Sequence, residues 1–302
     1  MKKLFKWIGR LLLVVLVLAG AFFTHVWYFK PYDINLFFGR TALKFAMDSP
    51  ETLSSVRVLE GMGITGHNAK LDDASLESGD EMFEMITKAH KTLKSYADED
   101  LNAADKMSKD VMLSLLDLVV ENQRFRFHNY PVNQLFGVQN GFPSFMESTH
   151  QVHNVDDAED YISRLSLIDI KFDQVLEGLK HRENLGILPP QFVVTKVLDE
   201  MRGFVNTPAE DNILYMALGE KMEKAKLELS DQQDMAKQAK TEIEKTVYPA
   251  YQKLIDYFVA LDHKVENNYG VWNLPDGDAF YVTALNLFTS TKAVLLRNVK
   301  LD

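Results

Sequence analysis

The 302-residue sequence contains no cysteine. This absence excludes disulfide bonds, a thiolate nucleophile, zinc held by cysteine and a lipid-modified cysteine. An excess of positive charge is also missing, because the formal net charge is −10. A nucleic-acid-binding surface needs clustered Lys and Arg, so we expect no nucleic-acid partner. With 46% hydrophobic and 25% charged residues, the composition is that of a folded globular protein.

The sequence also lacks the motifs of common hydrolases and nucleotide-binding proteins. It has neither His-Glu-x-x-His nor Gly-x-Ser-x-Gly. His150 and His153 have a spacing that a metal could use on a helix, but no carboxylate is placed with them, and surface histidines are the simpler interpretation. The glycines between Gly61 and Gly66 follow no apolar strand, which favours a loop over a phosphate site. We therefore predict no catalytic residue, no metal site and no cofactor in this chain.

The N-terminus has the pattern of a membrane anchor. Residues 11–29 contain no Asp, Glu, Lys or Arg, and about 20 such residues cross a bilayer. The segment follows a basic start and ends in the aromatic residues Trp27, Tyr28 and Phe29, which suit a membrane interface. Because basic residues stay in the cytoplasm, we predict a single-pass inner-membrane protein with its body in the periplasm, attached through residues 11–29.

A cleaved signal peptide is the alternative to this anchor. Residues 11–18 would form its apolar core, and Ala19-Gly20-Ala21 supplies the small residues of a cleavage site. The chain would then be secreted to the periplasm. Cleavage would leave an apolar new terminus beginning at Phe22, so we favour the anchor. A buried core helix is disfavoured, since core helices are rarely apolar on all sides at a chain terminus.

Behind residue 30 the apolar residues recur at helical spacing, which predicts an all-α fold. One helix is predicted over 102–125 and another over 156–181, with Asn154 as its cap and a stop at Gly186 and Pro189-Pro190. The predicted apolar faces are Met107, Val111, Leu115, Leu118 and Phe125 in the first helix, and Tyr161, Leu165, Ile168, Phe172, Val175 and Leu179 in the second.

Three further helices and one irregular segment are predicted. A short helix covers 191–205, and Thr207-Pro208-Ala209-Glu210 has the composition of a capped helix start. A long charged helix covers 230–266, with a kink or break near Tyr248 because Pro249 lies inside it. Residues 127–154 are predicted to be an irregular loop, and a loop of that length is usually functional or tightly packed.

The run from Tyr269 to Tyr281 is the most informative segment of the chain. By its residues alone it predicts a Gly-Trp loop, a Pro-Asp-Gly turn and a helix start. Four other segments accompany it: residues 49–53 with Gly61 and Gly63, residues 127–137, residues 156–186 with the following Pro189-Pro190, and residues 207–218. Together, and in this order, these segments resemble one bacterial family, the domain of unknown function 885 group.

The resemblance implies a helical fold like that of thimet oligopeptidase and related zinc peptidases, in which two helical halves flank a cleft. This chain resembles the N-terminal half only. The zinc ligands and general base of the family belong to the other half, so no catalytic residue is carried over, and zinc is expected only in a full-length relative. We expect a signal anchor or signal peptide over 1–30, a helical domain over 31–291 and a divergent tail over 292–302. A disrupted gene or a naturally short relative would explain that tail.

The resulting hypothesis is the membrane-anchored N-terminal part of a periplasmic zinc-dependent peptidase, inactive alone, whose partners are a peptide substrate or a missing C-terminal half. The alternative is a non-catalytic helical binding module of the cell envelope. Tyr130, Asn133 and Gln134 are the predicted substrate-cleft contacts, because polar loop side chains often orient ligands. Satisfaction of the loop backbone by Asn133 and Gln134 is an equally good interpretation.

Overall fold

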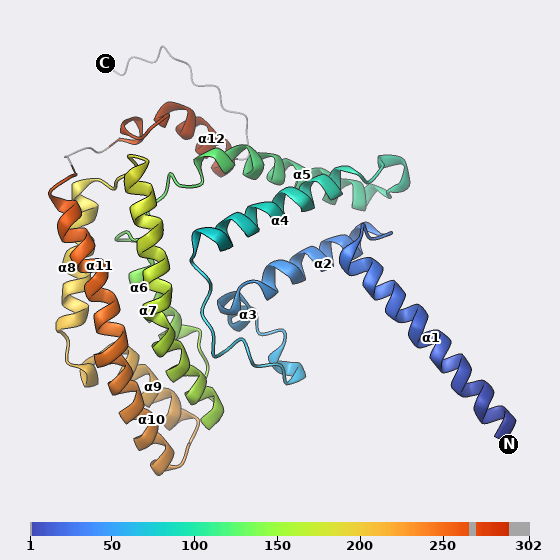
Figure 1. Cartoon of the computed structure of the whole chain (residues 1–302), viewed down its shortest axis with the longest axis horizontal. Coiled ribbons are helices and arrows are strands. Elements are labelled where there is room, and N and C mark those ends of the chain that lie inside the picture. Colours follow the sequence, from blue (N-terminus) through green and yellow to red (C-terminus); the bar gives the residue numbers. More distant parts are fainter. Residues whose placement is uncertain (1, 266–269, 290–302) are drawn as a thin grey trace. The chain divides into compact units, whose positions relative to one another are not determined.

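The computed structural model of the protein describes residues 2–265 and 270–289, and these residues form helices and turns without a strand (Figure 1). The all-α prediction is therefore confirmed for this part of the chain. The predicted tail over 292–302, Glu266 and Tyr269 lie outside the described residues.

Two compact units share the chain. One contains Met1–Met47 and Glu84–Val120, and the other contains Asp48–Phe83 and Glu121–Asp302. Helices α4 (Leu76–Lys94) and α5 (Ala103–Asn122) each begin in one unit and end in the other. The boundaries predicted at residues 30 and 291 stay predictions.

The smaller unit contains α1 (Lys2–Tyr28), α2 (Ile34–Met47), η2 (Asp98–Asp100) and most of α4 and α5. Its segment Lys6–Tyr28 is long and apolar enough to cross a membrane, by length and composition alone. The turn between α1 and α2 is fixed by Tyr96, whose hydroxyl donates to the Pro31 carbonyl at 2.6 Å. The small core consists of Ile34, Phe37, Ala89, Leu93 and Tyr96.

The apolar face predicted over 102–125 is only partly a core face: Phe125 is buried and Leu118 is half-buried, but the residues nearer the start of α5 are exposed. Met107 and Val111 are 69% and 66% exposed, and Leu115 is exposed as well. The face that packs on the small core instead carries Leu113 and Leu116, in line with the buried Lys109. Lys109 can be buried because its amine donates to the Tyr96 carbonyl and pairs with Asp98 at 2.7 Å. The helical spacing was right, but spacing alone does not show which face is covered.

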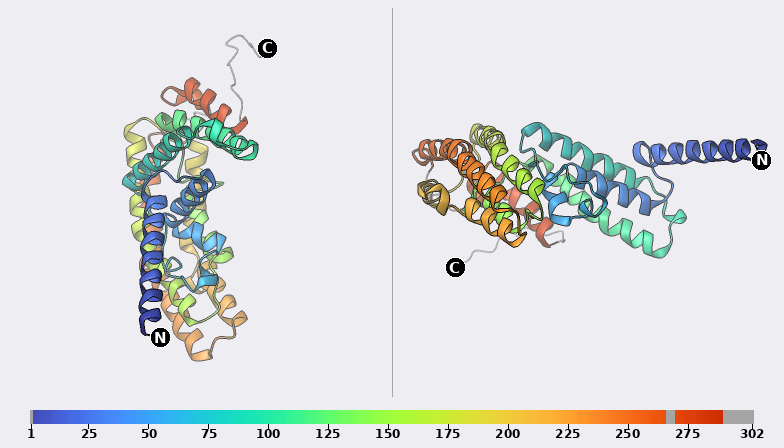
Figure 2. Two further views of the ribbon diagram at one scale, coloured as in Figure 1. Left: turned by 90° about the vertical axis from the view of Figure 1, so that its right-hand side faces the viewer. Right: turned by 90° about the horizontal axis from the view of Figure 1, so that it is seen from below.

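The larger unit is built around α7 (Val155–Asn184), against which α10 (Leu229–Glu242) and α11 (Tyr248–Asp262) pack. Helix α8 (Gln191–Asn206) lies along α11 (Figure 1 and Figure 2). Helix α9 (Ile213–Lys224) contacts α6 (Val138–Ser148). The unit also holds α3 (Pro50–Val56), η1 (Glu60–Met62), η3 (Gln123–Phe125), η4 (Ala209–Asp211), η5 (Ile243–Val247), η6 (Val271–Asn273) and α12 (Gly277–Thr289).

The predictions for α7 are confirmed in detail. The Asn154 side chain accepts a hydrogen bond from Asp157 N at 2.9 Å and caps the helix. All six predicted apolar positions are buried. The helix ends at Asn184, and Gly186 lies just beyond it with a φ of +74°, the left-handed conformation that glycine adopts without steric cost. The predicted short helix over 191–205 is α8.

The break predicted near Tyr248 is also confirmed. Helix α10 passes into the π-helical turn η5, and α11 begins at Tyr248 with Pro249 in its first turn. Proline has no backbone N–H and its ring displaces the carbonyl four residues earlier. A wider π turn directly before Pro249 accommodates both effects.

The capped helix start predicted at Thr207 is wrong. Thr207 does not cap a helix, because its hydroxyl donates to the Gly203 carbonyl at 3.0 Å. The short 3₁₀ turn η4 follows instead, and Asn212 caps α9 by accepting from Leu214 N. Glu210, the expected partner in the cap, pairs with Lys240.

The segment 127–154 is not wholly irregular, because it contains the 11-residue helix α6 with Pro143 inside. In a regular helix the amide of residue 143 would donate to the carbonyl of Gln139, and proline cannot do so. The hydroxyl of Tyr251, on α11, donates to that carbonyl instead. Gly141 and Pro143 disfavour a helix here, but Tyr251, which is distant in the sequence, stabilises α6.

Arg164 of α7 is fully buried and joins the 48–83 segment to the helices of the larger unit. Its Nε donates to the Lys70 carbonyl at 2.8 Å, and Nη2 donates to Ser54 Oγ at 2.7 Å and the His67 carbonyl at 3.2 Å. Its Nη1 lies 2.7 Å from His150 Nδ1. Burial lowers the pKa of Arg164 to about 10, and Glu51 is the largest opposing influence. The guanidinium stays charged at neutral pH.

These contacts define the protonation state of His150. Its Nε2 lies 3.0 Å from the Asp157 carbonyl, which only accepts, so Nε2 carries the hydrogen. Nδ1 is then free to accept from Arg164. Burial, reinforced by the charge of Arg164, lowers the pKa of His150 to about 3. The suggestion that His150 is a surface histidine is wrong, since it is 2% exposed, whereas His153 is exposed and lies 3.4 Å from Arg57.

Replacing Arg164 with Ala should lower the free energy of unfolding by about 3 kcal/mol, because several buried acceptors would lose a charged donor. Urea unfolding followed by circular dichroism measures this. The control is Arg202→Ala, an exposed arginine on α8, which should change stability by less than about 0.5 kcal/mol. Equal effects of the two substitutions would contradict the role of Arg164.

Stability should fall as the pH drops from about 6.5 towards 3, because the unfolded chain binds a proton at His150 that the folded chain rejects. This one group contributes a slope of up to about 1.4 kcal/mol per pH unit in that window. Carboxylates titrate there too, so the measured quantity is the difference in slope between the wild type and His150→Gln. His153→Gln is the matched control and should leave the slope unchanged.

Candidate functional site

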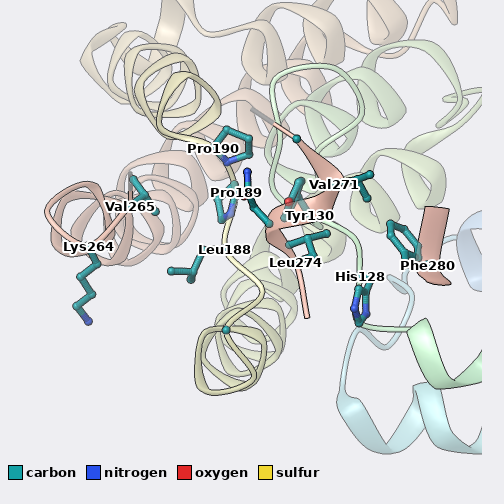
Figure 3. Close-up of a pocket in the computed structure, with 13 residues that line it drawn as sticks. His128, Tyr130, Leu188, Pro189, Pro190, Lys264, Val265, Val271, Leu274 and Phe280 are labelled. Atoms are coloured by element: carbon teal, nitrogen blue, oxygen red, sulfur yellow. The ribbon is translucent and has the colours of Figure 1, made fainter. Parts of the chain in front are cut away.

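A cavity of about 380 Å³ lies in the larger unit, where the ends of α7 and α11 meet two turns from distant parts of the sequence. We name this cavity the end pocket. Figure 3 shows the residues that line it. They are His128, Tyr130, Gly186, Leu188, Pro189, Pro190, Lys264, Val265, Gly270, Val271, Asn273, Leu274 and Phe280.

The segment Gly270–Phe280 forms one wall of the end pocket and has the predicted loop, turn and helix start. Gly277 N donates to the Leu274 carbonyl at 3.0 Å, closing a turn in which Asp276 has a φ of +51°. Gly277 itself is packed tightly. A Cβ at this position would lie 2.1 Å from Val271 O and 2.9 Å from Trp272 Cα. The glycine therefore allows η6 to lie against the start of α12.

His128 attaches this wall to the loop before α6. Its Nε2 lies 2.8 Å from the Pro275 carbonyl, so Nε2–H is the donor. Its ring centroid lies 5.0 Å from that of Phe280 and 5.0 Å from that of Phe125. In the neutral ring Nδ1 is an acceptor, and no described residue donates to it. His128 thus combines a structural hydrogen bond with an unused nitrogen atom.

Tyr130 is a half-buried polar residue of the end pocket, and burial raises the pKa of its phenol. Figure 3 places it among Pro189, Val271 and Leu274. Asn273 is exposed and supplies an amide to the lining. Lys264 extends away from the other labelled residues (Figure 3), and its Nζ lies 2.6 Å from Glu183 Oε1. The lining thus combines polar groups with an apolar wall.

Of the three predicted cleft residues, only Tyr130 lines the end pocket. Asn133 accepts hydrogen bonds from Leu135 N and Phe136 N, both at 2.9 Å, and donates to the Tyr130 carbonyl at 2.8 Å. These bonds shape the loop that carries Tyr130. Gln134 is half-buried and outside the pocket lining. A role of Asn133 or Gln134 in substrate contact stays a prediction.

Residue types did not identify His128, Asn273 or Phe280 as site residues, and Gly186 was predicted only as a helix end. The one feature of the sequence that pointed to these residues was the resemblance to the family. Residues 127–137, the Pro189-Pro190 stop and the described part of the 269–281 run were quoted for the resemblance separately, and all three contribute to the end pocket.

The donor groups of the described residues do not fit a zinc ion. Among residues 2–265 and 270–289, no three His, Asp or Glu side chains could hold one metal. His128 has no carboxylate or second histidine in the pocket lining, and both nitrogens of His150 are engaged.

Comparison with known proteins agrees with the resemblance. A family model described as bacterial protein of unknown function (DUF885) matches residues 58–295. The chain belongs to the DUF885 family. No curated protein matches it.

A solved structure shares the fold of this DUF885 protein. It is the crystal structure of "the putative lipoprotein from Colwellia psychrerythraea", with a TM-score of 0.73 and 19% sequence identity. The similarity covers 84% of the present chain and 46% of the other chain. The DUF885 chain thus spans less than half the length of that protein.

Replacing Gly277 with Ala should destabilise the larger unit by roughly 1–3 kcal/mol, because the new Cβ collides with backbone atoms of η6. Gly219→Ala on α9 is the matched control. A Cβ there meets nothing within 4 Å, so this substitution should stabilise by about 0.5–1 kcal/mol. Urea unfolding of both variants tests the difference, and a neutral Gly277→Ala would contradict the packing described.

Proposed function

We propose that this chain is the membrane-anchored N-terminal part of a peptide-hydrolysing protein of the cell envelope. In this proposal the end pocket binds part of a peptide substrate, and the zinc ligands lie outside the residues described here. The body lies in the periplasm and α1 crosses the inner membrane. The chain alone is expected to be inactive.

The proposal is supported by one observation above all: three of the segments that resemble the family line the same pocket. The size and chemistry of this pocket suit a ligand. Ligand pockets usually measure about 300–1,000 Å³ and combine an apolar lining with a few polar groups. The end pocket has an apolar wall, formed by Leu188, Pro189, Pro190, Val265, Val271 and Leu274. Tyr130 and Asn273 add a hydroxyl and an amide suited to peptide groups.

Peptide binding to the end pocket can be tested by fluorescence anisotropy. The full chain in detergent is titrated against a mixture of labelled unstructured peptides. Tyr130→Ala should weaken binding about tenfold, as expected for the loss of a half-buried aromatic contact of about 1.4 kcal/mol. Tyr281→Ala is the control, because Tyr281 is exposed and does not line the pocket. Equal binding by wild type and Tyr130→Ala would refute the pocket.

The expectation that the chain alone is inactive is tested by separate measurements. Elemental analysis of the same preparation should find no stoichiometric zinc, and no peptide should be cleaved, since a catalytic zinc needs three well-placed protein ligands. One zinc per chain together with chelator-sensitive cleavage would refute it. Peptide binding that never accompanies hydrolysis, even in full-length relatives, would favour the binding module.

A further inference from the structure

A second cavity, of about 180 Å³, lies in the smaller unit at the junction of α1 and α2. We name it the junction pocket. Its lining includes the cationic residues Lys30, Arg40, Lys44 and Lys88, and no Asp or Glu. Tyr28, Phe29, Thr41, Met85, Ala89 and Thr92 complete it.

The cations from α2 are held against the carboxyl end of α1. Arg40 Nη1 donates to the carbonyls of Val26 and Phe29 at 3.0 and 2.5 Å, and Lys44 Nζ donates to the Trp27 carbonyl at 3.0 Å. These are final carbonyls of a helix, which have no partner within the helix. The side chains of α2 therefore lie at the level of the last turn of α1, beside the aromatic residues typical of a membrane interface.

The positive charge of the junction pocket is not neutralised. None of its four cations forms an ion pair with a carboxylate among the described residues. The end of a helix supplies only about half a negative charge, which leaves a surplus of roughly three and a half positive charges. Burial, together with Arg40 and Lys88, lowers the pKa of Lys44. Arg40 Nε is also buried without an acceptor among the described residues.

A phosphate group would meet each of these requirements, because it carries negative charge and several strong acceptor oxygens. We propose that the junction pocket binds the phosphate of an anionic phospholipid in the leaflet that faces the body of the protein. Free phosphate has the same chemistry. The lipid is the occupant that fits a pocket lined by Tyr28 and Phe29, which are 70% and 63% exposed at the end of an apolar helix. This inference rests on the membrane anchoring proposed above.

The test is a lipid titration of the full chain in mild detergent, followed by native mass spectrometry. Phosphatidylglycerol should bind in preference to zwitterionic phosphatidylcholine. Lys88→Gln should weaken the binding of phosphatidylglycerol about fivefold, which corresponds to about 1 kcal/mol for one lysine near an anionic lipid. Lys88 is exposed and forms no ion pair among the described residues, so this variant should fold normally.

Lys91→Gln is the matched control, with the same charge change one turn further along α4 but outside the pocket. Equal binding of the two lipids, or equal losses in Lys88→Gln and Lys91→Gln, would overturn the proposal. Saturable binding of inorganic phosphate that displaces phosphatidylglycerol would assign the pocket to free phosphate instead. Alkaline washing of membranes tests the anchor separately: a chain that washes off refutes the span, while the titration still decides the pocket.

Discussion

The larger unit depends on one buried cation, the guanidinium of Arg164. The 48–83 segment places few apolar side chains in a core, and Leu53 is its main buried hydrophobic residue. Its buried groups are instead polar, namely Ser54 and His67. Arg164 binds the Ser54 hydroxyl and the carbonyls of His67 and Lys70, and also holds His150 in one tautomer. A segment that buries little apolar surface needs such bonds to offset the entropy lost on ordering.

The bundle and the end pocket have different physical origins. Helices α7, α8, α10 and α11 are fixed by contiguous apolar faces, whereas the pocket lies at helix ends and in the turns that leave them. Turns can present polar groups because their backbone is not fully used within a helix. Side-chain hydrogen bonds hold both turns in place. Asn133 forms hydrogen bonds within the loop that carries Tyr130, and His128 donates to the Pro275 carbonyl of the opposite wall.

Local sequence patterns predicted those features whose causes are local. The cap at Asn154, the glycine stop at Gly186 and the break before Pro249 each follow from neighbouring residues. Helix α6 was missed because its stability depends on Tyr251, more than one hundred residues away. The α5 face was misassigned because periodicity does not show which side is covered. For the candidate site, three of the segments quoted for the resemblance do line the end pocket. Only the hydrogen bonds distinguish Tyr130, which lines the pocket, from Asn133, which shapes the loop.

The protein holds cations in two contrasting environments. The hydrogen-bond partners of Arg164 are all neutral groups of the chain, including a histidine that burial keeps uncharged, so every nitrogen of its guanidinium is satisfied within the fold. The cations of the junction pocket are only partly satisfied, since Arg40 and Lys44 bond helix-end carbonyls and Arg40 Nε has no acceptor among the described residues. Cations placed close together repel one another, and a bound anion would reduce that repulsion. Arg164 is therefore satisfied within the chain, whereas the cations of the junction pocket are left open to an anion, for which an anionic phospholipid is the proposed occupant.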